Sequence, residues 1–479
     1  MRFPVVIRQI GAVLMINALF LFISFIISWF NDESSVFPLL YSSLIVLIFG
    51  IFPLIYVPSF KYLTLLEGIT IIVFGWITTC IVGMLPYIMW GSEFTLINAW
   101  FESVSGYTTT GSTILNDIEA LPNGLLFWRS ATHWIGGIGV IVFALLILPQ
   151  PVTSKLVLVH SEISGIAKSN FRTRATQTVK ILAVVYIGLT LLQTVFLMLA
   201  GMGIFDAVNH SFATIATGGF STKNTSIAYY DSVLIEVIIM VFMVLSGLHF
   251  GLIFSTLTGK RENLFNSEIV RAFIIVLFIG IALTTLKLWL TGYGNFWDSL
   301  RVSSFQVISV GTTTGFATAD TAGWPVFTIL ILTYFTIQCA CAGSTSGGLK
   351  FDRVLMFFKA IILQIKSMQH PQGVFQLKIN KHSVEEGVVS NAMVFILLYL
   401  FIIFSTTLII SFMDVDIITS FSASATTIGN VGPGFGGVSS MGNFNGLPAM
   451  AKFILSLNML LGRLEIFSII SLFFIKSWK

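Results

Sequence analysis

The chain has 479 residues, of which 56% are hydrophobic and only 10% are charged, and its net charge is +4. A soluble domain carries about 25% charged residues, so this composition excludes a soluble globular protein and indicates one integral membrane unit. The small basic excess implies no nucleic-acid partner, because the Lys and Arg residues cluster in loops between apolar runs.

Ten apolar segments follow one another along the chain, and a transmembrane helix needs about 20 residues. The segments cover residues 11–30, 37–57, 66–90, 125–149, 180–204, 230–257, 268–291, 324–369, 390–413 and 447–475. The eighth is too long for one crossing and is interrupted at residues 343–348. The first two segments stand apart, and the other eight form four repeats of a spanning helix, a short amphipathic stretch, a Gly/Thr-rich segment and a second spanning helix.

The Gly/Thr-rich segments are the main functional signal. They lie at residues 107–112, 215–220, 311–316 and 429–433, with pivot glycines Gly111, Gly218, Gly315 and Gly432. Irregular backbone at membrane depth is tolerated only where it lines a water-filled cavity. Carbonyl oxygens of such loops can replace the water around a bare cation, and glycine permits the dihedral angles that this needs. Simple turns between helices would not explain the repetition, so a cation pore is predicted.

The short stretch before each segment begins with a residue typical of helix N-caps. These residues are Asn98, Asp206, Asp298 and Asp416. An acidic vestibule that attracts cations is a second interpretation, and both can hold. A helix that is capped outside the membrane directs the partial negative charge of its C-terminus toward the pore.

The basic residues predict the orientation in the membrane. Of the 25 Lys and Arg residues, 19 fall on the side that also holds both termini. The positive-inside rule then places both termini in the cytoplasm, with the Gly/Thr-rich segments entering from outside. The basic stretches at residues 150–180 and 349–386 could also dock a cytoplasmic subunit, although the positive-inside rule alone accounts for them.

The side chains of the four segments restrict the chemistry. The segments contain no carboxylate, His or Cys, and backbone oxygens suit a hard cation rather than a transition metal. No P-loop, nucleophile elbow or dinucleotide fingerprint is present, so we expect neither an enzyme nor a covalently bound cofactor. A secondary carrier for a small solute is the main alternative, because carriers also contain broken helices. An intramembrane enzyme would need paired carboxylates or a Ser/His cluster, and none is visible.

Several longer motifs carry a family resemblance. They lie at residues 101–111, 134–139, 216–222, 312–320 and 341–350. In this combination the chain resembles the TrkH/KtrB/HKT superfamily of potassium transporters, and most closely its bacterial TrkH branch. The resemblance covers the whole chain, since the two leading helices also fit that branch.

The resemblance implies an all-α membrane protein in which two leading helices precede four helix–pore-loop–helix repeats around a pseudo-fourfold pore. It divides the chain into the two-helix segment, residues 1–62, and four pore repeats, residues 63–160, 161–262, 263–382 and 383–479. The filter ligands would be backbone carbonyls of Thr109, Thr110, Gly111, Ala216, Thr217, Gly218, Thr313, Thr314, Gly315, Asn430, Val431 and Gly432. In relatives that permeate sodium, the glycine of the first segment is replaced by serine, whereas this chain has Gly111, as potassium-selective relatives do. A sodium-permeable member of the superfamily is the alternative.

The resemblance also implies partners and a location. It predicts a homodimer in the bacterial inner membrane, with K+ as the transported ion. A cytoplasmic ring of TrkA subunits would control opening, and any regulatory nucleotide would bind to that ring rather than to this chain.

Two features are candidates for a gate. The first is the interruption formed by Gly343, Ser344, Thr345, Ser346, Gly347 and Gly348, which is either a simple kink or a flexible loop that blocks the pore. The second is Arg463, an intramembrane charge and therefore a functional candidate. Arg463 either lines the pore below the filter, pairs with Glu465 or extends to an interface. Residues two apart do not face each other on a helix, so pairing with Glu465 is disfavoured.

Five other polar residues lie within or beside apolar runs. Arg129 and Lys287 are expected at the membrane interfaces. His133, Glu236 and His249 are expected to be buried and hydrogen-bonded, although a proton relay is an alternative.

Overall fold

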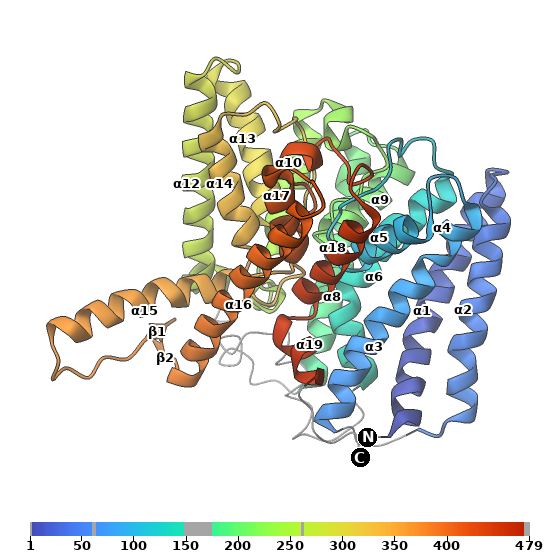
Figure 1. Cartoon of the computed structure of the whole chain (residues 1–479), viewed down its shortest axis with the longest axis horizontal. Helices are drawn as coiled ribbons and strands as arrows, with labels where there is room; N and C mark the ends of the chain where they lie inside the picture. The colour runs from blue at the N-terminus through green and yellow to red at the C-terminus, as the bar shows by residue number, and fades with distance from the viewer. Residues whose placement is uncertain (1, 60–63, 148–174, 260–262, 474–479) are drawn as a thin grey trace.

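The computed structural model describes residues 2–59, 64–147, 175–259 and 263–473, and these residues are almost entirely helical (Figure 1). Within these ranges the sheet content is one antiparallel hairpin, β1 (Lys378–Ile379) with β2 (His382–Ser383). The predicted all-α class is therefore confirmed. The expected repeat boundaries at residues 62–63, 160–161 and 262 touch residues outside the described ranges, as does most of the basic stretch 150–180.

The two leading helices, α1 (Phe3–Phe30) and α2 (Val36–Tyr56), pack against each other at one edge of the molecule (Figure 1). The contact depends on two glycines, because a Cβ atom on Gly11 would lie 2.7 Å from the carbonyl oxygen of Gly50. Small residues allow membrane helices to approach closely. The α1 helix also packs on the first repeat, so the leading pair is an extension of the repeat array.

Four repeats of three parts follow. The first helices are α3 (Leu65–Gly83) with its continuation α4 (Leu85–Trp90), α8 (Ala175–Leu199), α12 (Glu268–Leu290) and α16 (Glu386–Ser411). The short pore helices are α5 (Leu96–Tyr107), α9 (Ile204–Ile215), α13 (Phe296–Gly311) and α17 (Ile417–Gly429). The second helices are α6 (Asn123–Ile147), α10 (Val233–Gly247) with α11 (Phe250–Leu257), α14 (Val326–Ile337) with α15 (Phe351–Gln369), and α18 (Ala449–Arg463) with α19 (Ile466–Phe473).

Among the described residues, 6 helices are long and apolar enough to cross a membrane, or 7 if the bent pair α10 and α11 is one span. The difference from the ten predicted segments comes mainly from the second helices. The α10 and α11 helices meet at 104°, so the continuous helix expected over residues 230–257 is wrong. The helix expected over 447–475 also divides, at Leu464 and Glu465. The interruption predicted at residues 343–348 is confirmed.

The break between α10 and α11 has local causes. A Cβ atom on Gly247 would lie 3.1 Å from the Thr312 methyl group and 3.3 Å from Ala340, so only a small residue fits at the end of α10. His249 then starts α11 as its N-cap, since its ring nitrogen accepts a hydrogen bond from the Gly251 N–H at 3.0 Å. A capped start is a new helix rather than a kink. Hydropathy does not register such a break, because the residues on both sides are apolar.

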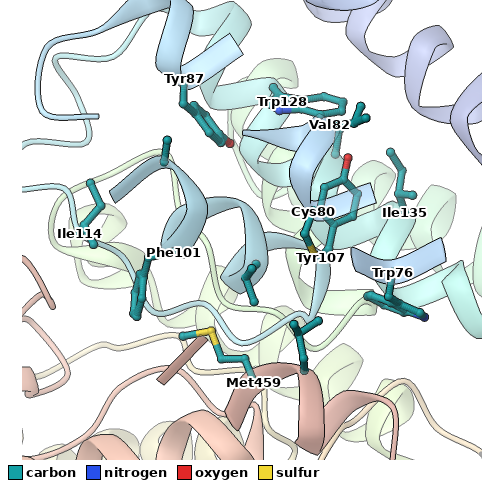
Figure 2. Close-up of a cluster of buried hydrophobic side chains, with 14 of the residues drawn as sticks. Trp76, Cys80, Val82, Tyr87, Phe101, Tyr107, Ile114, Trp128, Ile135 and Met459 are labelled. Atoms are coloured by element: carbon teal, nitrogen blue, oxygen red, sulfur yellow. The ribbon is translucent and has the colours of Figure 1, made fainter. Parts of the chain in front are cut away.

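The largest core cluster lies behind the first pore helix. Figure 2 shows Phe101 and Tyr107 of α5 among side chains of α3 and α6, with Met459 of α18 nearby. The Tyr107 hydroxyl donates to Asn17 Oδ1 of α1 at 2.6 Å, and the Trp128 indole donates to the Gly83 carbonyl at 3.1 Å. Buried aromatic residues with satisfied polar atoms make a rigid support. The C-terminal end of α5 is therefore fixed from the side opposite the pore.

Candidate functional site

The pore helices begin at Thr95, Gly203, Asn295 and Asp416, which are the observed N-caps. Of the expected caps only Asp416 is confirmed, because Asn98, Asp206 and Asp298 lie at the third helical position instead. The side-chain oxygens of Thr95 and Asn295 accept hydrogen bonds from the backbone N–H groups of Asn98 and Asp298, at 3.3 Å and 2.9 Å. Asn98 and Asp298 were expected to cap their helices, but their own backbone N–H groups are the ones that receive a cap.

The C-terminal ends of the pore helices lead into four backbone segments of the same conformation. A left-handed residue comes first in each: Thr109 (φ 54°), Thr217 (φ 54°), Thr313 (φ 60°) and Asn430 (φ 53°). Two residues later a glycine again has positive φ: Gly111 (81°), Gly219 (81°), Gly315 (81°) and Gly432 (100°). We call residues 109–111, 217–219, 313–315 and 430–432 ring segments 1 to 4.

Each ring segment is attached to its pore helix by the same hydrogen bond. The backbone N–H of the second residue donates to the carbonyl oxygen five residues earlier, and the four N···O distances are 2.9, 2.8, 2.8 and 3.0 Å for Thr110, Gly218, Thr314 and Val431. This bond and the left-handed residue before it are the features of a Schellman helix end. Local bonding within each repeat therefore sets the conformation of all four segments.

The common conformation corrects the alignment of the second repeat by one residue. Gly219, not the expected pivot Gly218, is equivalent to Gly111, Gly315 and Gly432, because it has the positive φ. Ala216, expected as the first ligand of this segment, is the C-cap of α9 with φ −74°. Two consecutive glycines occur only in this segment, so the sequence offers two registers and the backbone dihedrals distinguish them.

Three of the left-handed residues are threonines, and this is unusual. A β-branched residue at positive φ is a genuine outlier, and each such residue costs about 1–3 kcal/mol. Strained residues of this kind persist where the surroundings hold them, and they cluster at functional sites. The repetition at Thr109, Thr217 and Thr313 therefore makes the ring the candidate functional site.

The four segments close into a ring through contacts between neighbours. A Cβ atom on Gly111 would overlap the carbonyl oxygen of Gly218, and one on Gly219 would overlap that of Thr314. In the same way a Cβ atom on Gly315 would overlap the carbonyl oxygen of Val431. A Cβ atom on Gly432 would lie 2.5 Å from the carbonyl oxygen of Thr110, and this contact closes the ring. Each glycine is required twice, for its positive φ and for the close approach of the next segment. The second residue of every segment thus supplies the carbonyl oxygen at an equivalent place.

The two ends of the ring open onto different surroundings. All four ring glycines border a cavity of about 410 Å³, whose lining also includes Asn116, Asn224 and Asp320. At the other end two of the left-handed residues, Thr217 and Asn430, contact the central loop, defined as residues 343–348. The Thr217 hydroxyl lies 3.4 Å from the Thr345 hydroxyl, and a Cβ atom on Gly347 would overlap the Asn430 side chain. The central loop therefore lies directly against the ring.

Backbone contacts and hydroxyl groups tie the central loop to other repeats. The Thr345 hydroxyl donates to the carbonyl oxygen of Ile215 at the end of α9, at 2.9 Å. The Gly343 carbonyl accepts from the Phe250 N–H of α11 at 3.0 Å, and the Gly348 N–H donates to the Gly462 carbonyl at 3.3 Å. The loop is thus held by repeats 2 and 4, although it belongs to repeat 3.

Two buried cations also bind the central loop. The guanidinium of Arg463 donates to the Thr345 carbonyl, and to the Gly136 carbonyl of repeat 1 at 2.7 Å. The ammonium of Lys350 donates to the Ser346 carbonyl. Both side chains are buried, and both line a smaller cavity of about 60 Å³ with the loop. Two basic side chains therefore lie on the side of the ring that faces the central loop.

These contacts test whether Arg463 pairs with Glu465. Glu465 pairs with Arg353 at 2.9 Å, whereas the contacts given above for Arg463 run to carbonyl oxygens of other repeats. The expectation that the local pair with Glu465 is disfavoured is confirmed. Lys350 was not predicted, because it stands at the edge of a basic stretch that topology already explains.

Other polar residues are placed by the structure as follows. His133 is buried and hydrogen-bonded, and Glu236 is buried and paired with Arg301 at 2.8 Å, as expected for both. His249 is hydrogen-bonded as expected, but its side chain is only half-buried. The interfacial position expected for Arg129 is wrong, because its side chain is 1% exposed and pairs with Glu102 at 2.8 Å. Hydropathy alone cannot reveal this partner, since Glu102 lies in another helix. Lys287 lies half-buried in the last turn of α12.

No group of three or more His, Cys, Asp or Glu side chains suitable for a metal occurs in the described part of the chain. The oxygen atoms gathered at the ring are backbone carbonyls instead. The fold and this site define the class: an all-α integral membrane protein of several spans with four helix–pore-loop–helix repeats.

Comparisons with known proteins agree with this class. The family model TrkH, described as a cation transport protein, matches residues 58–478. The Trk system potassium uptake protein TrkH of Escherichia coli (strain K12) is 39% identical over 417 residues, which is 86% of each chain. The TrkH protein of Halomonas elongata is 36% identical over 422 residues, 88% of this chain and 87% of that one.

A solved structure covers the same fold. The crystal structure of the potassium transporter TrkH from Vibrio parahaemolyticus superposes with a TM-score of 0.90 at 30% sequence identity, over 100% of both chains. The chain belongs to the TrkH family of cation transport proteins. The relatives are membrane transport proteins and not enzymes.

Proposed function

We propose that this protein mediates potassium uptake across the bacterial inner membrane and that the ring segments form its selectivity filter. The observation that carries the proposal is the ring of four equivalent carbonyl oxygens, from Thr110, Gly218, Thr314 and Val431, closed by glycine contacts. Backbone carbonyls around an axis replace the hydration shell of K+. The names of the relatives, which are potassium uptake proteins, support the same ion.

The proposed ligands follow the observed register. In segments 1, 3 and 4 they are the carbonyl groups of residues 109–111, 313–315 and 430–432. In segment 2 the conformation favours residues 217–219 over the set that begins at Ala216. The C-terminal ends of four pore helices point at this ring, and their partial negative charges favour a cation there.

The central loop and Arg463 are proposed to form the gate, together with Lys350. A loop that lies against the inner end of the ring and is bound by two buried cations obstructs the pore sterically and electrostatically. Opening requires the loop to leave its carbonyl contacts with these side chains. A cytoplasmic partner that draws on α15 or α19 could supply that force, because both helices continue directly from the gate elements.

The remaining expectations are proposals of the same kind. Both termini are assigned to the cytoplasm by the positive-inside rule, and the repeat boundaries are those given for the five sequence divisions. A homodimer and a cytoplasmic TrkA ring with a regulatory nucleotide are proposed from the family resemblance. K+ is the transported ion, and this chain is proposed to need no covalent cofactor.

The function is tested by expression in a bacterium that lacks its own potassium uptake, followed by growth on low potassium. Rescue is expected. The purified protein in liposomes should give a Nernstian reversal potential under a potassium gradient alone. A potential that follows sodium instead would favour the sodium-permeable alternative. Failure of both assays, with saturable uptake of another solute, would favour the secondary carrier.

The gate is tested separately by Arg463→Ala and by deletion of residues 344–346. Each change removes a contact between the loop and repeats 1, 2 or 4, so potassium flux in the absence of a partner should rise. If neither change alters the flux or its control by a cytoplasmic partner, the gate assignment is wrong.

A further inference from the structure

A buried ion pair lies behind the first two ring segments. Glu102 of α5 and Arg129 of α6 are 0% and 1% exposed, and their nearest N···O distance is 2.8 Å. The Arg129 Nε atom also donates to Glu102 Oε1 at 2.9 Å. Burying two charges is costly, and it is repaid only when the geometry is good and the remaining polar atoms are satisfied. The contacts of this pair are therefore informative.

The pair joins the outer ends of ring segments 1 and 2. Glu102 accepts from the Thr113 hydroxyl at 2.9 Å and from the Ile114 N–H at 3.0 Å, just beyond segment 1. Arg129 donates to the Ser221 carbonyl at 3.2 Å, just beyond segment 2. Its guanidinium carbon also lies 4.1 Å from the centre of the Phe220 ring. The pair, with one side chain from each of two repeat 1 helices, thus connects the residues that directly follow segment 1 to those that directly follow segment 2.

A second residue on the same face of α6 reinforces this contact. His133 lies four residues after Arg129, which places it on the same side of the helix. Its Nε2 atom accepts from the Phe220 N–H at 3.1 Å, and its Nδ1 atom lies 2.7 Å from the Gly106 carbonyl of α5. A Cβ atom on Gly218 would lie 2.5 Å from the His133 ring. Segment 2 therefore rests on α6 of the neighbouring repeat.

The charge at this position is confined to repeat 1. Counting seven residues back from each left-handed residue gives Glu102, His210, Gln306 and Ala423. His210 and Gln306 also contact the chain after their own segments, through Ser221 at 2.9 Å and Ala319 at 2.9 Å. Neither of these residues is a carboxylate in an ion pair as Glu102 is, and the Ala423 side chain has no polar atom. The equivalent position therefore holds four different side chains in the four repeats, and of these four described residues only the one in repeat 1 belongs to an ion pair.

We propose that Arg129, held by Glu102, is a positioning residue that sets the spacing of ring segments 1 and 2 and thereby contributes to cation selectivity. The inference rests on the proposed function of the ring as a filter. A planar guanidinium with several donors in a rigid fork fixes direction as well as distance. Because it joins two neighbouring segments, it controls how closely their carbonyl oxygens approach the axis.

The test must separate positioning from simple support of the fold. A structural defect reduces the number of conducting molecules and so the size of the current. It does not change the reversal potential of the molecules that conduct. The ratio of potassium to sodium permeability, taken from reversal potentials in liposomes with the two ions on opposite sides, is therefore the appropriate measurement.

The variants are E102Q, R129Q, the double change E102Q/R129Q, and R129K, each in the full chain. E102Q and R129Q should each lower the permeability ratio about tenfold, which corresponds to about 1.4 kcal/mol of discrimination. The double variant should be no worse than the worse single variant, because residues that act as one unit are not additive. R129K keeps the positive charge but loses the planar fork of donors, so its permeability ratio should lie between those of R129Q and the unaltered protein.

The matched control is a Glu–Arg pair away from the ring, Glu236 and Arg301. Its Nε–Oε2 distance is also 2.8 Å, and its hydrogen bonds join α10 to α13 and to Asp231 rather than to a ring segment. E236Q and R301Q should leave the ratio unchanged.

The outcomes are distinct. An unchanged ratio in conducting E102Q and R129Q, or an equal shift in E236Q, overturns the proposal. If E102Q and R129Q do not fold, R129K decides in the same way, since an unchanged ratio overturns the proposal and a lowered ratio supports it. If the unaltered protein itself shows no potassium-selective potential, the proposed function fails instead.

Discussion

The ring segments and the central loop are both short, rich in glycine and hydroxyl side chains, and in contact with each other, yet they are held differently. Each ring segment is attached to its own pore helix by one repeated backbone bond. The central loop is attached to repeats 2 and 4 by the Thr345 hydroxyl, by two backbone hydrogen bonds and by the guanidinium of Arg463, which also donates to the Gly136 carbonyl of repeat 1. Bonds within a repeat give four copies of one rigid conformation. Bonds between repeats give one conformation that can be released.

This difference suits two separate tasks. A filter has to present the same oxygen positions continuously, so its backbone is fixed by local geometry. A gate has to exchange two arrangements, so its contacts must break together without unfolding a helix. Four changes can break or sharpen the comparison, and they are given in order of expected effect.

The largest effect is expected for Gly219→Ala. A Cβ atom costs about 1–2 kcal/mol at left-handed φ, and overlap with the Thr314 carbonyl adds about 1–3 kcal/mol. Potassium flux in liposomes should fall about a hundredfold, which corresponds to about 2.7 kcal/mol. Gly188→Ala is the control, because Gly188 lies exposed in α8 with nothing within 4 Å of its Cβ position. Normal flux in Gly219→Ala would contradict the corrected register.

The second effect is expected for Arg463→Ala, in the opposite direction. A hydrogen bond from a charged donor contributes about 1.5–3 kcal/mol, and this change removes the one to the Thr345 carbonyl. Flux measured without a partner should rise about tenfold. Arg353→Gln is the control, because Arg353 is also a buried cation but pairs with Glu465. A fall in flux for Arg463→Ala would mean that the arginine supports the open pore.

The third effect concerns the strained threonines. Thr313→Asn places the residue type of Asn430 at the equivalent position of segment 3, and asparagine tolerates left-handed φ better than a β-branched residue does. Thermal stability in detergent should rise by about 1 kcal/mol, within the range of such strain. The permeability ratio should stay the same, because the backbone carbonyl is unchanged. Thr313→Val keeps the shape and the strain, so a lower ratio in both variants would identify the hydroxyl as a ligand.

The smallest effect is expected from the outer caps. The backbone N–H and the hydroxyl of Thr419 bond to Asp416, and they hold the pKa of its carboxyl below the ordinary value. A group with a lowered folded-state pKa contributes stability above its unfolded pKa and loses it as the pH falls through the folded value. Asp416→Asn should therefore lower stability at pH 7 by about 0.3–1 kcal/mol, the size of a charge–dipole interaction at a helix start.

The pH dependence provides the check on that prediction. The difference in unfolding midpoint between Asp416→Asn and the unaltered protein should shrink as the pH falls below about 4 and disappear once the pH is below the lowered folded-state pKa, where the carboxylate is protonated. Asp414→Asn is the control, since Asp414 lies before the helix and does not cap it. A difference that persists at low pH would show that shape rather than charge is responsible.

Some parts of the site were accessible from sequence because they repeat. The Gly/Thr pattern predicted four segments, and each of them is found after a pore helix. The register in segment 2 was missed, because Gly218 and Gly219 are interchangeable until the dihedral angles are known. The caps at Thr95 and Asn295 were missed because Asn98 and Asp298, three positions later, are themselves residue types typical of helix caps.

Other parts have no periodic signal at all. The partners of Arg129 and Arg463 lie in different helices or repeats, so no local spacing links them. The breaks at Leu248 and Leu464 interrupt apolar runs without changing their hydropathy.

The sequence by itself determined the membrane class, the two leading helices, the four repeats and the break at residues 343–348. Those features depend on hydropathy and on glycine, which act locally along the chain. Only the tertiary structure decided the register of the ring, the attachment of the central loop to repeats 2 and 4, and the buried pair between Glu102 and Arg129. Each of these depends on which groups meet across helices, where a buried charge or carbonyl must find a partner that the chain order does not specify.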